Sequence, residues 1–148
     1  CGDNPDLLAR MGEVEARAQG RLTSLGFTDR VAELLAASDL LVTKPGPGSL
    51  AEAFHAGVPV VVMRNRHTIP QERFNTDFVK RRGLGLVVGH WSEIPAAVAR
   101  LRADPSERAA IRQRIGAMPA NRAVYEVLDI IAREAGRASA EPGPPSQP

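Results

Sequence analysis

Cysteine is nearly absent from this chain, with Cys1 the one example among 148 residues. A single thiol can form neither an intramolecular disulfide nor a zinc knuckle, which favours a reducing, cytoplasmic setting. No apolar run approaches the roughly 18 residues of a membrane-spanning helix, so we expect no span. Aromatic residues make up only 4% of the chain, whereas 43% of the residues are hydrophobic, which excludes wholesale disorder.

The sequence also lacks an excess of charge of one sign. Lys and Arg number 19 against 17 Asp and Glu, a net charge of +2, so we expect no nucleic-acid partner. The three histidines, His55, His67 and His90, are scattered without metal-ligand spacing, and we expect neither a metal ion nor a cofactor. The run Lys80-Arg81-Arg82 fits the end of a helix, where it would complement the dipole, or a contact with anionic lipid.

Apolar patterns of strand type and helix type alternate along the first 88 residues. Strands are expected at residues 21–25, 40–42, 58–63 and 84–88, with 40–42 covered on both faces. One helix is expected from Pro5 to about Gly20, and a second begins after Thr28 or Asp29 as its cap. Further helices are expected at residues 49–56, 70–82 and 92–103. The last two begin at residue 105 and at about residue 121, the latter ending near residue 134. This alternation predicts an α/β fold with a Rossmann-like parallel sheet and helices on both faces.

The domain is expected to span residues 1–135, followed by a disordered tail at 136–148 that is rich in Ala, Ser, Pro and Gly. Cys1-Gly2 is interpreted as the end of a truncated first strand, so the chain is expected to be a fragment. Asp104-Pro105-Ser106-Glu107 is a full helix start signal, with a cap, a proline in the first turn and a glutamate three residues on that is expected to bond back to the cap.

The segment Lys44-Pro45-Gly46-Pro47-Gly48, between an expected strand and a helix opening at Ser49, is the most informative motif. Unpaired N–H groups at a helix start attract anions, and glycines let a phosphate approach the backbone. Ser49 adds a hydroxyl and Lys44 a positive charge. Neither the Walker pattern nor GxGxxG occurs. A purely structural alternative is a capping box, in which Glu52 bonds back to Ser49 as the cap.

A second polar segment opens the next expected helix with Gln71, Glu72 and Asn75. Because the carboxyl ends of parallel strands share one sheet edge, it should lie beside the glycine-rich loop. A phosphate cradle next to groups that bind hydroxyls suggests a sugar nucleotide. A solvated polar first turn is the alternative.

Together, the residues at 25–28, 37–44, 46–53 and 57–59, with Gln71, Glu72 and Asn75, resemble the C-terminal domain of family 28 glycosyltransferases. The resemblance is strongest to monogalactosyldiacylglycerol synthases and processive diacylglycerol glucosyltransferases, and it runs from Cys1 to about Gly85. It implies that the chain is the donor-binding C-terminal half of a GT-B fold.

The resemblance also implies a role for each matching residue. Phe27 and Thr28 would hold uracil, Glu52 the ribose, and Gln71, Glu72 and Asn75 the donor sugar. The diphosphate would be held by Gly46, Pro47, Gly48 and Ser49. The catalytic base is expected in a missing N-terminal domain, so that the fragment alone would be inactive. The chain has no Asp-x-Asp metal motif, and amide donors at the helix start can stabilise the leaving diphosphate instead.

The function expected from the resemblance is inverting transfer of galactose or glucose, from UDP-galactose or UDP-glucose, to a diacylglycerol-type lipid. The enzyme would be cytoplasmic and peripheral on the inner face of the cell membrane. Two alternatives stay open: a UDP-sugar 2-epimerase on the same scaffold, for which no acid/base residues are found, and a non-catalytic sugar-nucleotide-binding module. A plain α/β domain would not bind UDP at all.

Overall fold

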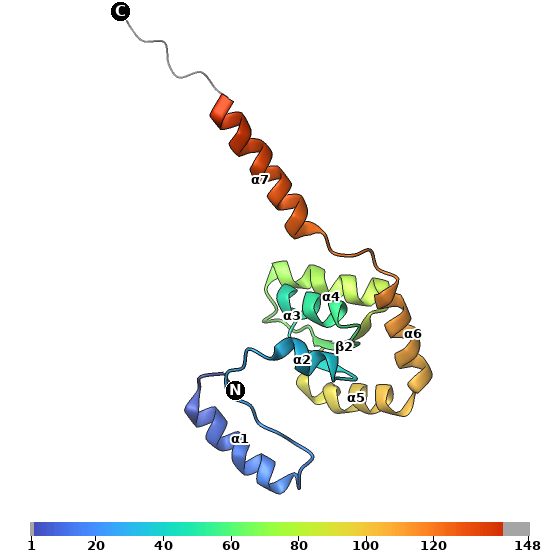
Figure 1. Cartoon of the computed structure of the whole chain (residues 1–148). Helices are drawn as coiled ribbons and strands as arrows, with labels where there is room; N and C mark the ends of the chain where they lie inside the picture. Colours follow the sequence, from blue (N-terminus) through green and yellow to red (C-terminus); the bar gives the residue numbers. More distant parts are fainter. Residues whose placement is uncertain (1, 141–148) are drawn as a thin grey trace, which may run out of the picture. The chain divides into compact units, whose positions relative to one another are not determined.

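Three short parallel strands lie at the centre of the fold (Figure 1). The computed structural model describes residues 2–140; Cys1 and residues 141–148 of the expected tail lie outside them. The chain divides into two units, Cys1–Ala117 and Met118–Pro148. The first unit contains, in order, α1 (Pro5–Arg17), α2 (Val31–Ala36), β1 (Leu41–Thr43), α3 (Pro47–His55), β2 (Val60–Met63), α4 (Pro70–Arg82), β3 (Gly85–Val88), the 3₁₀ helix η1 (Trp91–Glu93), α5 (Ile94–Ala103) and α6 (Pro105–Gly116).

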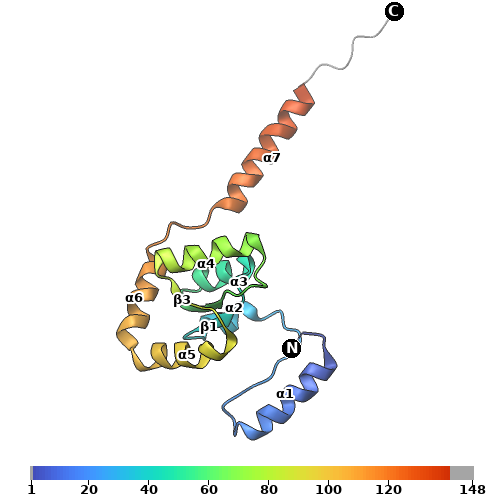
Figure 2. The same cartoon turned by 180° about the vertical axis from the view of Figure 1, so that it is seen from behind.

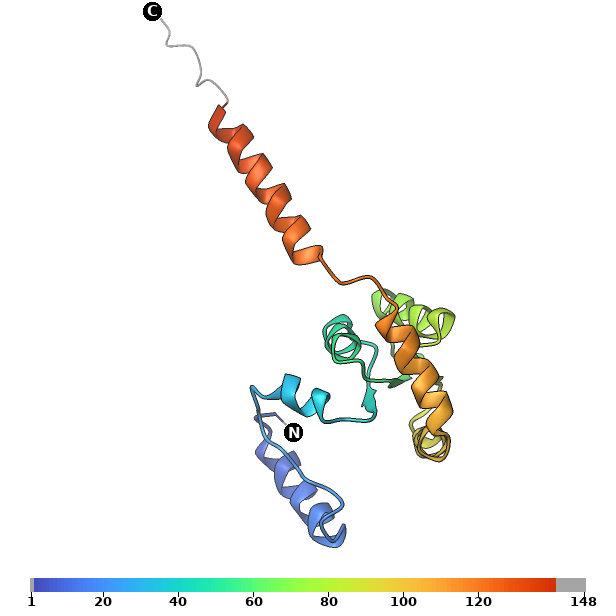
Figure 3. The same ribbon diagram turned by 45° about the vertical axis from the view of Figure 1, so that its right-hand side comes forward.

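The strands are arranged in the order β1-β2-β3, and each neighbouring pair is parallel. The connections from β1 to β2 and from β2 to β3 run in the same direction across the sheet. Because such connections are right-handed, their helices α3 and α4 lie on one face of the sheet, and α5 covers the other (Figures 1 and 2). The rings of Phe54 in α3 and Phe78 in α4 lie 6.5 Å apart, so these helices are neighbours (Figure 3). The expected Rossmann-like α/β fold is confirmed.

The core is built around the central strand β2. Its residues Val60, Val61 and Val62 are fully buried, with Val79 of α4 and Leu101 of α5 equally buried around them. Gly85 of β3 lies so close to β2 that a Cβ there would be 2.0 Å from the Val60 carbonyl oxygen, so only glycine fits. The continuous apolar run is therefore the signature of the middle strand, which has a strand on each side.

Two strand predictions are corrected. Residues 40–42 were expected to be covered on both faces, but β1 begins at Leu41, is an edge strand, and leaves Val42 45% exposed. Residues 21–25 do not form a strand, and the sheet of the described residues consists of β1, β2 and β3 without them. The Ser24 N–H instead donates to the Glu15 carboxylate of α1, at 2.9 Å. An alternating pattern is compatible with a strand, but joining a sheet also needs a ladder of hydrogen bonds to a neighbouring strand.

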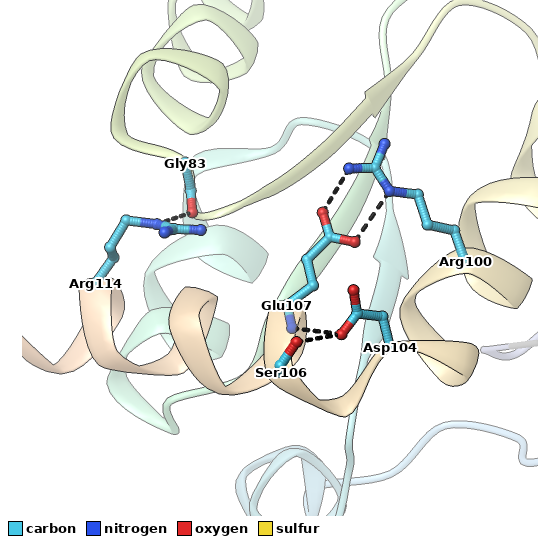
Figure 4. Close-up of polar contacts among 6 residues, drawn as sticks. All are labelled: Gly83, Arg100, Asp104, Ser106, Glu107 and Arg114. Carbon is cyan, nitrogen blue, oxygen red and sulfur yellow. Dashed lines mark hydrogen bonds and ion pairs between the residues drawn. The ribbon is translucent and has the colours of Figure 1, made fainter.

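The start signal at Asp104 is confirmed (Figure 4). The Asp104 carboxylate accepts hydrogen bonds from the Glu107 N–H at 2.9 Å and from the Ser106 hydroxyl. The expected bond from Glu107 back to the cap is wrong: among the described residues Glu107 pairs with Arg100 of α5, whose Nε lies 3.0 Å from Glu107 Oε2. In the same view, Arg114 Nε donates to the Gly83 carbonyl at 2.8 Å and so joins α6 to the end of α4.

The second unit consists of α7 (Ala123–Ala140) and the residues before it. The Asn121 side chain accepts a hydrogen bond from the Ala123 N–H at 3.0 Å. The helix runs past the expected end near residue 134 and into the segment from Gly136 that composition assigned to the tail. None of the helices within residues 2–140 combines the length and the apolar character needed to cross a bilayer.

Asp104 gives a prediction for the pH dependence of stability. The hydrogen bond from the Ser106 hydroxyl, and then that from the Glu107 N–H, lower the pKa of Asp104 from its ordinary 3.8. The charged form is therefore favoured by folding, so its contribution to stability is present above pH 3.8 and is lost as the pH falls through the lowered value. We expect Asp104→Ala to lower the Tm at neutral pH, and thermal melts should show this difference shrinking in acid.

Asp104→Asn is the matched control, because asparagine keeps a capping oxygen but cannot titrate. Its Tm should stay above that of Asp104→Ala at neutral pH. A wild-type advantage over Asp104→Ala that persists unchanged in acid would contradict this account.

Candidate functional site

The glycine-rich loop after β1 leads into α3 earlier than the sequence suggested. The helix begins at Pro47 with Gly46 as its N-cap, at φ −66° and ψ 137°, so the expected start at Ser49 is wrong. Proline is suited to the first helical position, because its fixed φ matches the helix and its missing N–H would have had no partner there. Ser49 therefore becomes the third helical residue.

This earlier start leaves two amide donors open at the head of α3. The N–H groups of Gly48 and Ser49 lie too early in the helix to have an i−4 partner. No backbone bond to a turn or side-chain cap uses them within the described residues. By contrast, the Gly46 N–H donates to the Lys44 carbonyl at 2.9 Å, and the Leu50 N–H to the Gly46 carbonyl at 3.2 Å. The positive end of α3 thus presents two amides and the Ser49 hydroxyl.

Gly48 is a glycine that the packing of the chain does not explain. A Cβ at this position would meet no atom within 4 Å, and its φ is not positive. Glycine in a helix costs about 0.5–1 kcal/mol relative to alanine. The missing side chain keeps the surface above the Gly48 N–H clear, as a ligand that approaches the backbone would require.

The capping-box alternative for Ser49 and Glu52 is not realised, because Ser49 is not the cap. Glu52 lies one turn farther along α3 and is exposed. Positions three and four apart share a helix face, so Glu52 lies on the side of α3 that carries Ser49 and Gly48. An acceptor thus follows the amide donors at a distance of about one helical pitch, 5.4 Å.

The second polar segment meets this loop directly. Asn75 Nδ2 of α4 donates a hydrogen bond to the Pro45 carbonyl oxygen at 2.8 Å. Lys44 Nζ lies 3.8 Å from Glu72 Oε1; the Glu72 side chain is 17% exposed and that of Lys44 77% exposed. Because the Lys44 side chain is so exposed, its ion pair with Glu72 is weak, and the side chain can turn toward an incoming anion. The structure therefore places Lys44, Pro45 and Gly46 beside Glu72 and Asn75.

The other expected site residues are not joined to this cluster. Gln71 and Phe27 are exposed, and among residues 2–140 no hydrogen bond links Gln71, Phe27 or Thr28 to the loop. The Thr28 hydroxyl accepts from the Arg30 N–H at 3.1 Å, just before α2 begins. Neither Thr28 nor Asp29 is therefore the cap of that helix. The segment leads into α2, which packs against α3.

Sequence reasoning missed two features. The carbonyl of the buried residue Pro45 accepts a hydrogen bond from Asn75, which is 30 positions later in the chain. No local sequence pattern indicates such a bond. A cavity of about 460 Å³ lies along β3 and α4 and contains none of the expected site residues; it is lined by Arg64, Thr76, Asp77, Lys80 and residues 85–89. The described residues contain no cluster of three His, Cys, Asp or Glu side chains that could hold a metal ion.

Comparison with known proteins gives a family for most of the chain. Residues 2–110 match the model of the glycosyltransferase family 28 C-terminal domain. A processive diacylglycerol beta-glucosyltransferase from Bacillus licheniformis is 33% identical over 133 residues, which cover 88% of this chain and 34% of the relative.

Two further relatives have related names. The chloroplastic monogalactosyldiacylglycerol synthase of Spinacia oleracea is 29% identical over 67% of this chain and 18% of its own length. A UDP-N-acetylglucosamine--N-acetylmuramyl-(pentapeptide) pyrophosphoryl-undecaprenol N-acetylglucosamine transferase from Desulforudis audaxviator is 31% identical over 82% of this chain and 34% of its own. The chain thus spans about a third or less of the length of these curated relatives.

The bond between Asn75 and Pro45 can be tested by its effect on stability. Asn75→Ala leaves the Pro45 carbonyl of a buried residue without its donor, which costs about 1–3 kcal/mol. We expect urea unfolding to show a loss of this size. Gln71→Ala, at an exposed position of the same helix, should stay within about 0.5 kcal/mol of wild type. Equal effects of the two substitutions would show that the bond does not hold the loop.

Proposed function

This chain belongs to glycosyltransferase family 28, and from that membership we propose that it binds the UDP-sugar donor of an enzyme that glycosylates a diacylglycerol-type lipid. Its relatives are named as transferases of sugars, which makes it part of a hexosyltransferase family. The donor, the acceptor and the activity of the whole protein belong to the proposal. Galactose and glucose are the proposed sugars, because the relatives that act on diacylglycerol are named for one or the other.

The observation that carries the proposal is the open start of α3. Gly48 and Ser49 present free N–H groups, Gly48 has no packing reason to be glycine, and Lys44 adds an exposed positive charge. Preorganised amide donors bind a diphosphate without having to reorganise as its charge grows. Glu72 and Asn75 lie beside this start, where a sugar attached to the diphosphate would extend.

Each residue has a proposed role in donor binding. Gly46, Pro47, Gly48 and Ser49 form the diphosphate cradle, in which the donors are the Gly48 and Ser49 amides and the Ser49 hydroxyl. Glu52 accepts hydrogen bonds from the ribose hydroxyls one turn along α3. Phe27 and Thr28 contact the uracil base.

Gln71, Glu72 and Asn75 are proposed to recognise the donor sugar. Because Asn75 Nδ2 is held by the Pro45 carbonyl, its side-chain oxygen is the group left to accept from a sugar hydroxyl. Glu72 is an acceptor for hydroxyls once Lys44 turns toward the phosphates.

The proposed reaction is an inverting transfer. A lipid hydroxyl oxygen forms a bond to C1 of the sugar as the bond from C1 to the diphosphate oxygen breaks. The leaving UDP takes the electron pair, and its growing negative charge is met by the amides at the start of α3 and by Lys44. We assign the base that takes the proton of the lipid hydroxyl to the part of the relatives that this chain does not span. We further propose that the enzyme works at the inner face of the cell membrane, where such a lipid is accessible.

Gly48→Ala separates ligand binding from folding. The added methyl group meets no atom of the chain and favours the helix, so stability should be unchanged or higher by about 0.5–1 kcal/mol. The same methyl group stands over the Gly48 N–H, so UDP binding measured by titration calorimetry should weaken by roughly ten-fold or more.

Gly116→Ala is the matched control for this experiment. Gly116 is also a helical glycine with open space at its Cβ, but it lies at the end of α6. It should leave UDP affinity unchanged. Absence of UDP binding by the wild-type chain, or equal binding by both variants, would overturn the proposal.

Glu52→Ala tests the ribose contact. Loss of a charged acceptor costs about 1.5–3 kcal/mol, so the Kd for UDP should rise by roughly 10- to 100-fold while thermal melts stay close to wild type. Glu126→Ala removes the same charge from α7 and should change neither quantity. Wild-type affinity in Glu52→Ala would remove Glu52 from the site. UDP binding without sugar transfer by the whole protein would instead favour a non-catalytic sugar-nucleotide-binding module.

A further inference from the structure

The side of α4 turned away from the sheet combines exposed apolar groups with positive charge. Phe74 is 63% exposed, and Ile69, the residue before the helix, is 53% exposed. Four cationic side chains around them are also exposed. We call this set the α4 outer face: Ile69, Arg73, Phe74, Lys80 and Arg81, with Arg82 in the last turn, which extends the positive charge toward the side of Asn75, seven positions earlier. α4 lies at the surface of the first unit in all three views (Figures 1, 2 and 3).

The positive charge of the α4 outer face is not cancelled by acidic groups of the same helix. Asp77 pairs with Arg64, which follows β2. Glu72 is mostly buried and is oriented toward Lys44 in the glycine-rich loop. The face therefore carries four cations and one acidic residue, Asp77, whose charge is offset by Arg64.

Two of the cations lie against aromatic rings. The Arg81 guanidinium carbon is 5.9 Å from the centroid of Phe74, and that of Arg82 is 5.7 Å from Phe78. The Arg81–Phe74 pair presents a charged group and an exposed ring at the same point of the surface, whereas Phe78 is half-buried beside Phe54. This is the composition of interfacial helices, whose apolar groups enter the acyl boundary while cations contact anionic headgroups.

The needs of the fold explain only part of this face. Cations in the last turn complement the helix dipole, which accounts for Lys80, Arg81 and Arg82. Arg73, near the start of the helix, opposes that dipole; its Nε donates to the Thr68 carbonyl at 3.3 Å, which anchors one end of its guanidinium. The stability of the helix does not explain why the apolar residues Ile69 and Phe74 are exposed.

We propose that the α4 outer face docks on a bilayer surface that contains anionic phospholipid. Charge complementarity selects this occupant, since each Lys or Arg near an anionic membrane adds to the attraction. By contrast, the exposed stripe of α7 is apolar, but the charges beside it are mixed, with Glu126 and Asp129 against Arg122 and Arg133.

If the chain takes part in lipid glycosylation, as the proposed function states, α4 contacts both the membrane and the donor site. This part of the inference rests on the proposed function. Glu72 and Asn75 project from the other side of α4 toward the glycine-rich loop. A helix with its side chains is about 10–12 Å thick. With the outer face on the lipid, the donor cradle would lie about one helix diameter from the headgroups that surround a lipid acceptor.

The test is sedimentation of the whole chain with phosphatidylcholine vesicles, with or without about one third phosphatidylglycerol. We expect binding to the anionic vesicles only, weakened by salt. The double variant Lys80→Gln/Arg81→Gln should bind roughly 30-fold more weakly, at about five-fold per cation. Phe74→Ser should bind about ten-fold more weakly, because it no longer inserts its ring.

Arg10→Gln/Arg102→Gln is the matched control. It removes the same charge from α1 and α5, at exposed side chains that form no ion pair among the described residues. It should bind the vesicles like wild type. Thermal melts of every variant separate loss of binding from loss of folding.

Three results would overturn the docking proposal: equal binding to neutral vesicles, equal losses in the Lys80/Arg81 and Arg10/Arg102 pairs, or binding to duplex DNA that is as tight and depends on the same residues. UDP affinity is measured separately without vesicles. A chain that binds anionic vesicles but not UDP would contradict the proposed function and leave the docking proposal standing. A chain that binds UDP but not anionic vesicles would contradict the docking proposal and leave the proposed function standing.

Discussion

The hydrogen bond from Asn75 Nδ2 to the Pro45 carbonyl, 2.8 Å long, is the contact on which the candidate site depends. It joins the loop after β1 to the helix after β2. Parallel strands bring the ends of these two connections to one edge of the sheet, but adjacency alone leaves a loop free to move. The bond fixes the loop against α4, and Lys44 and Glu72 then come within 3.8 Å of each other.

Pro47 determines what the loop can bind. By starting α3 two residues before Ser49, it leaves the N–H groups of Gly48 and Ser49 open and makes a capping box impossible. A start at Ser49 would have used its hydroxyl to cap the helix. Because a proline occupies the first helical position, the segment leaves open the amide donors that the proposed diphosphate site requires.

Three sides of α4 have different surroundings: the core, the glycine-rich loop and the solvent. Thr76 and Val79 are buried in the core, Glu72 and Asn75 meet the glycine-rich loop, and Arg73, Phe74 and Arg81 are exposed. The helix is long enough to separate these tasks, since 13 residues make more than three turns. Its position is fixed by packing on β3, so a membrane contact on one side and donor recognition on another would share one rigid element.

Local residue patterns predict the alternation of strands and helices, the bounds of α4, the cap at Asp104 and the family, because each of these depends on neighbouring residues or on short motifs. They do not predict which strand lies in the middle, nor that residues 21–25 stay outside the sheet, because both depend on residues distant in the chain. The head of α3 was misplaced because Pro47 and Ser49 are both good start signals. Only the tertiary structure brought Asn75 to Pro45, since a bond across 30 positions leaves no trace in local spacing.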